Sequence, residues 1–284
     1  MRLYYILLYI PFLFINCNKP QPEVSWVIIE KFELLENPNA SNEQGEMTHN
    51  VNQGFVSMGG RYIGTFELPI KIPIIAEGNQ SFTIIPGVIK NGINATKTRY
   101  PFMQNFSGDI ELKLNDTVTL QPTTMYSNNV TFLIEDFENP AIKIETDEVS
   151  KAQLVRSNDP SVEKWGNFFG RIDLNNEDSL YIGYTIFGQS LPAFGADVYL
   201  EMDYMNTNSL LTSVISYGPN MFEDDINIQL NPRENPEWRH IYIDLKEIVS
   251  VRQNAAVNEI GFTALLNELG TEKYIYLDNI KIVF

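Results

Sequence analysis

The sequence predicts an all-β protein, with a small N-terminal β-sandwich followed by a C-terminal jelly-roll β-sandwich. Strand-like apolar runs recur at short intervals along the chain, and glycines and prolines interrupt them. The first half lacks any apolar stripe of helical spacing that is long enough to matter. A length of 284 residues is sufficient for two domains that each bury a core.

Residues 1–17 have the pattern of an export signal. Arg2 supplies a positive charge, Leu3–Ile15 is apolar but too short to span a membrane, and Cys17 is the single cysteine. This stretch resembles the lipoprotein signals of Bacteroidota, although Phe14-Ile15-Asn16 departs from the usual residues before the cysteine. The resemblance implies lipidation at Cys17 and anchoring in the outer membrane, on either its periplasmic or its surface face. An ordinary signal peptide is the alternative.

A short polar tether, residues 18–22, precedes a predicted first domain over residues 23–126. Asn37–Gln53 is polar and lacks periodicity, which indicates a loop. The expected strands are Trp26–Leu35, Phe55–Met58, Tyr62–Leu68, Ile70–Ile75, Ser81–Ile85, Gly87–Ile89, Ile110–Leu114 and Thr117–Leu120. Gly64–Pro69 (GTFELP) and the segments after it resemble the PEGA and carboxypeptidase-regulatory-like modules, which implies a small β-sandwich without catalysis.

The predicted second domain covers residues 127–284. About nine strands with one core is the number expected of a jelly roll. They are Val130–Phe137, Phe168–Leu174, Leu180–Ile186, Ala196–Tyr204, Leu210–Tyr217, Ile226–Leu230, His240–Leu245, Glu259–Ala264 and Tyr274–Phe284, with one or two helical turns over Leu245–Val251.

The last strand is the element around which this domain is organised. Ile275 and Leu277 share one parity, and the apolar residues then change parity to Ile280 and Ile282 after Asp278-Asn279. One extra residue in the strand, a β-bulge, produces such a change. A strand this apolar needs neighbours on both sides, so we expect it near the centre of a sandwich.

Alternation in Val198–Tyr204 predicts a strand with one buried and one wet face. Leu200 and Met202 belong to the buried set, whereas Tyr199, Glu201 and Asp203 fall on the other side. We therefore expect solvated acids on that face.

The motifs EDFE (Glu135–Glu138), YLEMDY, WRHIYIDL and YLDNIKIV together resemble galactose-binding-like jelly rolls, and carbohydrate-binding modules in particular. In that group an acid of the first strand and an aspartate of the last often hold a structural Ca²⁺. By position, the resemblance implies Asp136, Glu138 and Asp278 as ligands, and carboxylates suit this cation. In the alternative reading, Asp278 and Asn279 shape the bulge through bonds to the backbone.

The same resemblance implies that aromatic faces stack on sugar rings. The candidate ligand contacts are Trp165, Tyr217, Phe222 and Trp238, with core packing as the alternative for Trp238. The expected partner is a glycan.

A catalytic function is not predicted. The two histidines, His49 and His240, lack a zinc-site spacing, and no nucleophile elbow, Walker loop or dinucleotide fingerprint is present. A net charge of −16 disfavours nucleic acid as a partner. The function predicted from the sequence is that of a non-catalytic outer-membrane lipoprotein that binds glycan. The alternative is a protein-interaction lipoprotein that serves an envelope or secretion complex.

Overall fold

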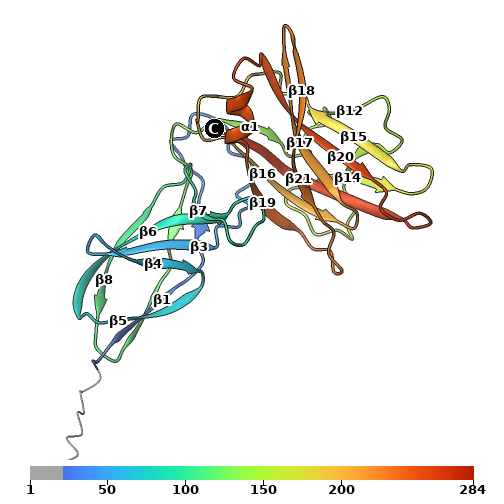
Figure 1. The fold of residues 1–284 in the computed structure, drawn as a ribbon. Coiled ribbons are helices and arrows are strands. Elements are labelled where there is room, and N and C mark those ends of the chain that lie inside the picture. The colour runs from blue at the N-terminus through green and yellow to red at the C-terminus, as the bar shows by residue number, and fades with distance from the viewer. Residues whose placement is uncertain (1–21) are drawn as a thin grey trace, which may run out of the picture.

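The computed structural model describes residues 22–284, which form two neighbouring β-sandwich units (Figure 1). The all-β prediction is confirmed, since twenty-one strands of the described chain are accompanied by one short helix, α1 (Lys246–Val251). That helix is where the sequence placed one or two turns. No helix within residues 22–284 is long and apolar enough to cross a bilayer. The export signal and Cys17 lie outside the described residues.

The N-terminal unit contains ten strands. They are β1 (Ser25–Ile29), β2 (Glu33–Leu34), β3 (Gln53–Met58), β4 (Arg61–Glu67), β5 (Ile70–Ile74), β6 (Gly78–Ile89), β7 (Lys97–Arg99), β8 (Phe106–Leu112), β9 (Thr117–Leu120) and β10 (Thr123–Thr124). The largest sheet has the order β4-β3-β6-β7 with β8 also on β6, and a second sheet has the order β5-β1-β9. Val27, Val56 and Phe82 lie in the core between them.

The C-terminal unit is the jelly roll. Its strands are β11 (Phe132–Glu135), β12 (Ile144–Thr146), β13 (Leu154–Ser157), β14 (Phe169–Leu174), β15 (Leu180–Thr185), β16 (Tyr199–Asn206), β17 (Leu210–Gly218), β18 (Met221–Leu230), β19 (Arg239–Asp244), β20 (Val257–Leu265) and β21 (Lys273–Val283). One sheet, here called the interface sheet, has the order β13-β14-β21-β16-β19, with β11 also on β21. The other, here called the open sheet, has the order β12-β15-β20-β17-β18.

Strand β21 occupies the centre of the interface sheet, with β14, β16 and β11 as partners, and so has the neighbours on both sides that its apolar sequence predicts. The predicted bulge is also present. Glu201 pairs with Lys281 and Asp203 with Asp278, so one residue of β16 faces two of β21. Asn279, inside the bulge, has a φ of 48°. The extra residue lets Ile275 and Ile280 both point into the core.

The expectation of a wet face on β16 is wrong. Tyr199, Glu201 and Asp203 are buried, because the N-terminal unit packs on that face of the interface sheet. The Tyr100 ring of that unit lies 5.2 Å from the ring of Tyr199 and 4.9 Å from that of Tyr242. Alternation within one strand reports which side faces the local core. It does not report whether a second unit covers the other side.

Two further expectations need correction. The predicted strand Trp26–Leu35 is divided into β1 and β2, and β6 runs without interruption through Pro86, where a break between strands was expected. Pro86 faces Gly54 across the sheet, and its carbonyl accepts a bond of 2.9 Å from the Tyr100 N–H. The segment before β3 lacks regular structure, as predicted, but Val51 and Gln44 in it are buried.

Candidate functional site

The outer face of the open sheet carries the candidate functional site. Tyr181, Val214 and Ile260 point into the jelly-roll core. Side chains of alternate residues point the other way, so Tyr184, Tyr217 and Glu259 lie on the outer face. The register brings them together, because Tyr217 faces Phe222 on β18 and Val257 on β20, two residues from Glu259.

The half-buried Tyr217 and the exposed Phe222 form an aromatic pair on this face. Their ring centroids are 5.4 Å apart, and Phe222 is 68% exposed. The Tyr217 hydroxyl lies beside the Glu259 carboxylate. Burial, followed by the negative charge of Glu259, raises the pKa of Tyr217 to about 12, so the phenol is neutral and able to donate. Burial also raises the pKa of Glu259.

The charge on this part of the jelly roll is acidic. Glu259, Asp224 and Glu145 lie on the outer face of the open sheet. The cation Arg252 is paired with Asp225 at 2.7 Å and with Glu223 at 3.3 Å. Aromatic rings next to hydrogen-bond acceptors suit a ligand that has both apolar faces and hydroxyl groups. The same surface disfavours an anionic ligand.

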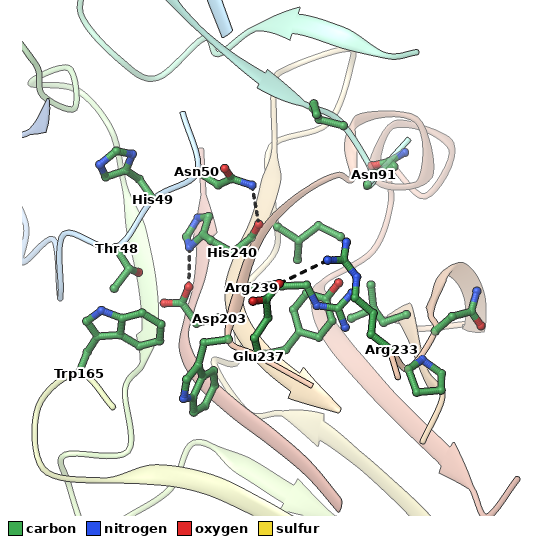
Figure 2. A pocket seen from close by; sticks show the side chains of 18 of the residues that line it. Thr48, His49, Asn50, Asn91, Trp165, Asp203, Arg233, Glu237, Arg239 and His240 are labelled. Atoms are coloured by element: carbon green, nitrogen blue, oxygen red, sulfur yellow. Dashed lines mark hydrogen bonds and ion pairs between the residues drawn. The ribbon is translucent and has the colours of Figure 1, made fainter. Parts of the chain in front are cut away.

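The other two predicted ligand contacts lie elsewhere. Trp165 and Trp238 lie edge to face, 5.4 Å apart, in a cleft of about 940 Å³ between the two units (Figure 2). The Trp238 indole N–H donates a bond of 2.5 Å to the Glu163 carbonyl, and its ring lies 6.0 Å from that of Phe169. The four predicted contacts therefore form two pairs, one on the open sheet and one in this cleft.

A buried polar cluster joins the two units behind the cleft. Glu201 is fully buried, accepts hydrogen bonds from the hydroxyls of Tyr100 and Tyr126, and lies 3.5 Å from His240 Nε2. Burial alone would raise the pKa of Glu201, but bonds and charges from His240, Lys281 and Tyr100 lower it overall. The carboxylate is therefore ionised within the interface.

His240 and Lys281 are the cations of this cluster. Burial alone would lower the pKa of His240, but the Asp203 carboxylate, 2.9 Å from Nδ1, and Glu201 raise it to about 9. The buried Lys281 ammonium donates to the Glu46 carbonyl at 2.5 Å, and burial lowers its pKa. Although His240 Nε2 has no hydrogen-bond partner among the described residues, the bonds from Tyr126 to Glu201 and from Lys281 to Glu46 run between the units. The cluster therefore has a role in joining the units.

The three predicted calcium ligands have different surroundings. The Glu138 carboxylate accepts bonds from the N–H groups of Asn167 and Phe168, at 2.6 and 2.9 Å, and so organises a loop. Asp136 accepts from the Glu138 N–H at 3.1 Å. Within residues 22–284, no three His, Cys, Asp or Glu side chains are arranged so that they would hold a metal ion.

Asp278 differs from the other two because one of its carboxylate oxygens is buried without a partner in the described part of the chain. Its Oδ1 accepts from the Asn279 N–H at 2.8 Å, as the turn-shaping alternative predicts, but its buried Oδ2 has no partner. Burial, aided by the charges of Asp203, Asp136 and Glu138, raises the pKa of Asp278 to about 9. Calcium binding stays a prediction, with Asp278 as the ligand that the fold leaves free.

No family model matches the chain, and no curated protein matches it significantly. Among solved structures, the chain is similar to carbohydrate-binding modules from the β-sandwich superfamily with promiscuous specificity, at 15% identity and a TM-score of 0.41, over 81% of this chain and 84% of that one. It is also similar to a xylan-binding domain from family 22 of these modules, at 10% identity and a TM-score of 0.38, over 55% of this chain and 96% of that one.

A third similar structure is xylanase 10B of Clostridium thermocellum with its family 22 module, solved with xylohexaose. The identity is 14% and the TM-score 0.39, and the match covers 53% of this chain and 28% of the xylanase. At these identities and TM-scores the likeness is confined to the arrangement of the strands.

Sequence reasoning missed two members of the open face. Tyr184 and Glu259 lie in strands that were predicted, and the alternation around them places each on the outer side. The missing information was the pairing of β15, β20 and β17. Without it, neither residue could be placed next to Tyr217.

Proposed function

We propose that this protein is a non-catalytic, glycan-binding lipoprotein of the outer membrane, and that the open sheet of its jelly roll contacts the glycan. The observation that carries the proposal is the Tyr217–Phe222 pair, with Phe222 exposed, beside the Glu259 carboxylate. Large exposed aromatic side chains that gather on one face of a soluble domain mark a contact surface.

The chemistry of this face fits a neutral glycan. The C–H face of a sugar ring packs on an aromatic ring, and its hydroxyls donate to carboxylates such as those of Glu259 and Asp224. Tyr217 provides a neutral hydroxyl that bonds Glu259 and whose oxygen can accept from a sugar hydroxyl. A polyanionic glycan would meet both these local acids and a net charge of −16.

The anchoring part of the proposal rests on the sequence of the leader. Cys17 follows the apolar stretch directly, and strand β1 begins at Ser25, so only a short tether separates a lipidated cysteine from the folded part. Such a tether would hold the N-terminal unit near the membrane and the jelly roll farther from it.

A protein partner is the alternative occupant of the same face. Ile226 and Leu265 are 67% and 63% exposed on the open sheet, and exposed aliphatic side chains favour a protein surface over a sugar. The two functions differ in one respect that is simple to measure, because only the glycan-binding protein recognises an isolated oligosaccharide.

A glycan array probed with the soluble form, residues 20–284, tests the proposal. We expect binding to a group of related neutral oligosaccharides. The variant with Tyr217→Ala and Phe222→Ala should lose that binding while it keeps the circular dichroism spectrum of the wild type. An array without any bound oligosaccharide, together with capture of an envelope protein that depends on Phe222, would replace this function by the alternative.

A further inference from the structure

We propose that the cleft between the two units is a second carbohydrate-binding site, built by both units together, that holds a neutral sugar. The proposal deepens the glycan-binding function, on which it rests for the class of ligand. It differs in location, because the cleft lies at the interface sheet and not on the outer face of the open sheet.

The size and lining of the cleft fit a sugar. Its volume of about 940 Å³ lies near the upper end of the range for small-molecule sites. Trp165 and Trp238 offer two indole surfaces, both partly exposed. Side chains of Asn50, Asn91 and Arg233 lie around the same space in Figure 2.

Two asparagines of the N-terminal unit each have one polar atom of the side-chain amide hydrogen-bonded and the other without a partner in the residues that the structure describes. Asn50 donates through Nδ2 to the His240 carbonyl at 3.4 Å, and its backbone N–H donates to the Tyr242 hydroxyl at 3.1 Å. Asn91 accepts the Asp244 N–H through Oδ1 at 2.8 Å. Within residues 22–284, no hydrogen bond engages Oδ1 of Asn50 or Nδ2 of Asn91.

This leaves one fixed acceptor and one fixed donor at the cleft. A sugar hydroxyl both donates and accepts, so it can use either amide. Because each amide is already anchored through its other atom, binding would cost little side-chain ordering. Such anchoring is expected of groups that serve a ligand, whereas a freely rotating surface amide would have to be ordered first.

The charges around the cleft nearly cancel, with one cation in excess. Arg233 and Glu237 form a partly exposed pair at 3.5 Å, and His240 is paired with Asp203 at 2.9 Å. The remaining cation, Arg239, lies over the Tyr204 ring at 4.5 Å and donates to Asn206 at 2.7 Å. Neither an anionic nor a cationic ligand would find a large excess of opposite charge here, which favours a neutral sugar.

The cleft requires both units. Met47–Asn50 and the turn at Asn91-Gly92 come from the N-terminal unit, and the tryptophans and Arg233 come from the jelly roll. The Asn91 N–H donates to the Tyr242 carbonyl at 2.8 Å, and Lys90 pairs with Asp244 at 3.0 Å, so this turn is fastened to the edge strand β19. The site is incomplete in a jelly roll alone.

Tryptophan fluorescence separates this site from the open sheet. The sequence has three tryptophans; Trp165 and Trp238 line the cleft, whereas Trp26 lies against Lys71 in the N-terminal unit. The aromatic side chains of the open sheet described above are Tyr184, Tyr217 and Phe222. A sugar in the cleft should therefore change tryptophan emission, and one on the open sheet should not.

The experiment titrates residues 20–284 with xylohexaose, cellohexaose, mannohexaose and laminarihexaose, and follows calorimetry and tryptophan emission in parallel. At least one of these neutral oligosaccharides should change the emission. The change should persist in the variant with Tyr217→Ala and Phe222→Ala, which lacks the open-sheet contacts. Trp165→Ala should weaken this binding at least tenfold, and the matched control Trp26→Ala should leave its affinity unchanged.

Asn91→Asp tests the contribution of the N-terminal unit. It keeps Oδ1 for the Asp244 N–H and tolerates the φ of 57°, but it replaces the free donor by an acceptor. We expect at least a tenfold loss of affinity in the emission titration and an unchanged unfolding midpoint.

Binding detected by calorimetry without any change in emission would overturn the second site and leave the proposed function intact. An emission change that disappears with Tyr217→Ala and Phe222→Ala, but survives Asn91→Asp, would likewise overturn it. Absence of binding by either method would contradict both this site and the proposed function.

Discussion

The Tyr126 hydroxyl donates a 2.7 Å hydrogen bond to the Glu201 carboxylate, and this bond joins the N-terminal unit to the jelly roll. Both side chains are fully buried. Removing the hydroxyl leaves a buried carboxylate with one partner fewer, and hydrogen bonds to charged groups contribute roughly 1.5–3 kcal/mol. We expect Tyr126→Phe to lower the free energy of unfolding by about this amount in urea denaturation.

Tyr62→Phe is the matched control. The Tyr62 hydroxyl bonds Thr65 at 2.6 Å, but the residue is 54% exposed. Loss of this hydroxyl should therefore change the free energy of unfolding by only about 0.5 kcal/mol or less. Equal effects of the two variants would show that the bond to Glu201 does not hold the units together.

His240 should make stability depend on pH. Its pKa in the folded protein is about 9, above the ordinary value of 6.5. The stabilisation by the charged imidazole is therefore complete below pH 6.5 and is lost as the pH rises through 9, on the order of 3 kcal/mol in all. Unfolding free energies measured from pH 6 to 9.5 should fall more steeply for the wild type than for His240→Gln.

His49→Gln provides the comparison. Burial lowers the pKa of His49, so its contribution to stability increases with pH, whereas that of His240 decreases. The His49→Gln variant should keep the decline above pH 6.5. If His240→Gln retained the same decline, another group would be responsible.

The thermal stability of the protein should depend on calcium if Asp278 is a ligand. If calcium binds only the folded chain, a concentration a hundredfold above its dissociation constant stabilises by roughly 2.7 kcal/mol. Calcium should raise the thermal midpoint of the wild type, and a chelator should reverse the change. Asp278→Asn should be insensitive to both.

The same variant has a second signature without metal. The pKa of Asp278 is raised from 3.8 to about 9, so folding becomes less favourable as the pH rises between these values. A neutral amide removes this effect, and Asp278→Asn should therefore have the higher midpoint at pH 8 in chelator. If calcium does not change the wild-type midpoint, but Asp278→Asn still has the higher midpoint at pH 8, then Asp278 is a protonated, turn-shaping residue and the metal site does not exist.

Cys17→Ser tests the anchor. A lipidated cysteine carries several acyl chains, which stable membrane residence requires. The variant should leave the membrane fraction or remain unprocessed, and it should not incorporate labelled palmitate. Label and membrane association equal to those of the wild type would end the lipoprotein hypothesis.

The parts of the fold that depend on local pattern are predictable from the sequence. The parity change around Asp278 predicted the bulge, and the apolar character of β21 predicted its neighbours on both sides. The short strands β12 and β13 were missed, because three or four residues carry too little periodicity. Glu201 and Asp203 were expected in water, since no local signal reveals that Tyr100 and Tyr126 of another unit cover them.

In the candidate sites, too, local sequence pattern indicates some residues, and long-range pairing determines the others. Tyr217 and Phe222 were candidate ligand contacts implied by the resemblance to carbohydrate-binding modules, and pairing across the open sheet places Tyr184 and Glu259 near them. The cleft depends on Asn50 and Asn91, which lie far from Trp238 in the sequence. Only the contact between the two units brings these residues together.

Glycan binding by the open sheet is tested most directly by calorimetry of residues 20–284 with a neutral oligosaccharide identified on the array. The affinity that matters is that of the binding event that leaves tryptophan emission unchanged. Phe222→Ala is compared with Phe194→Ala, since Phe194 is 83% exposed in the segment between β15 and β16. We expect an affinity at least tenfold lower for Phe222→Ala and an affinity equal to that of the wild type for Phe194→Ala. Equal affinities for all three proteins would contradict glycan binding by the open sheet.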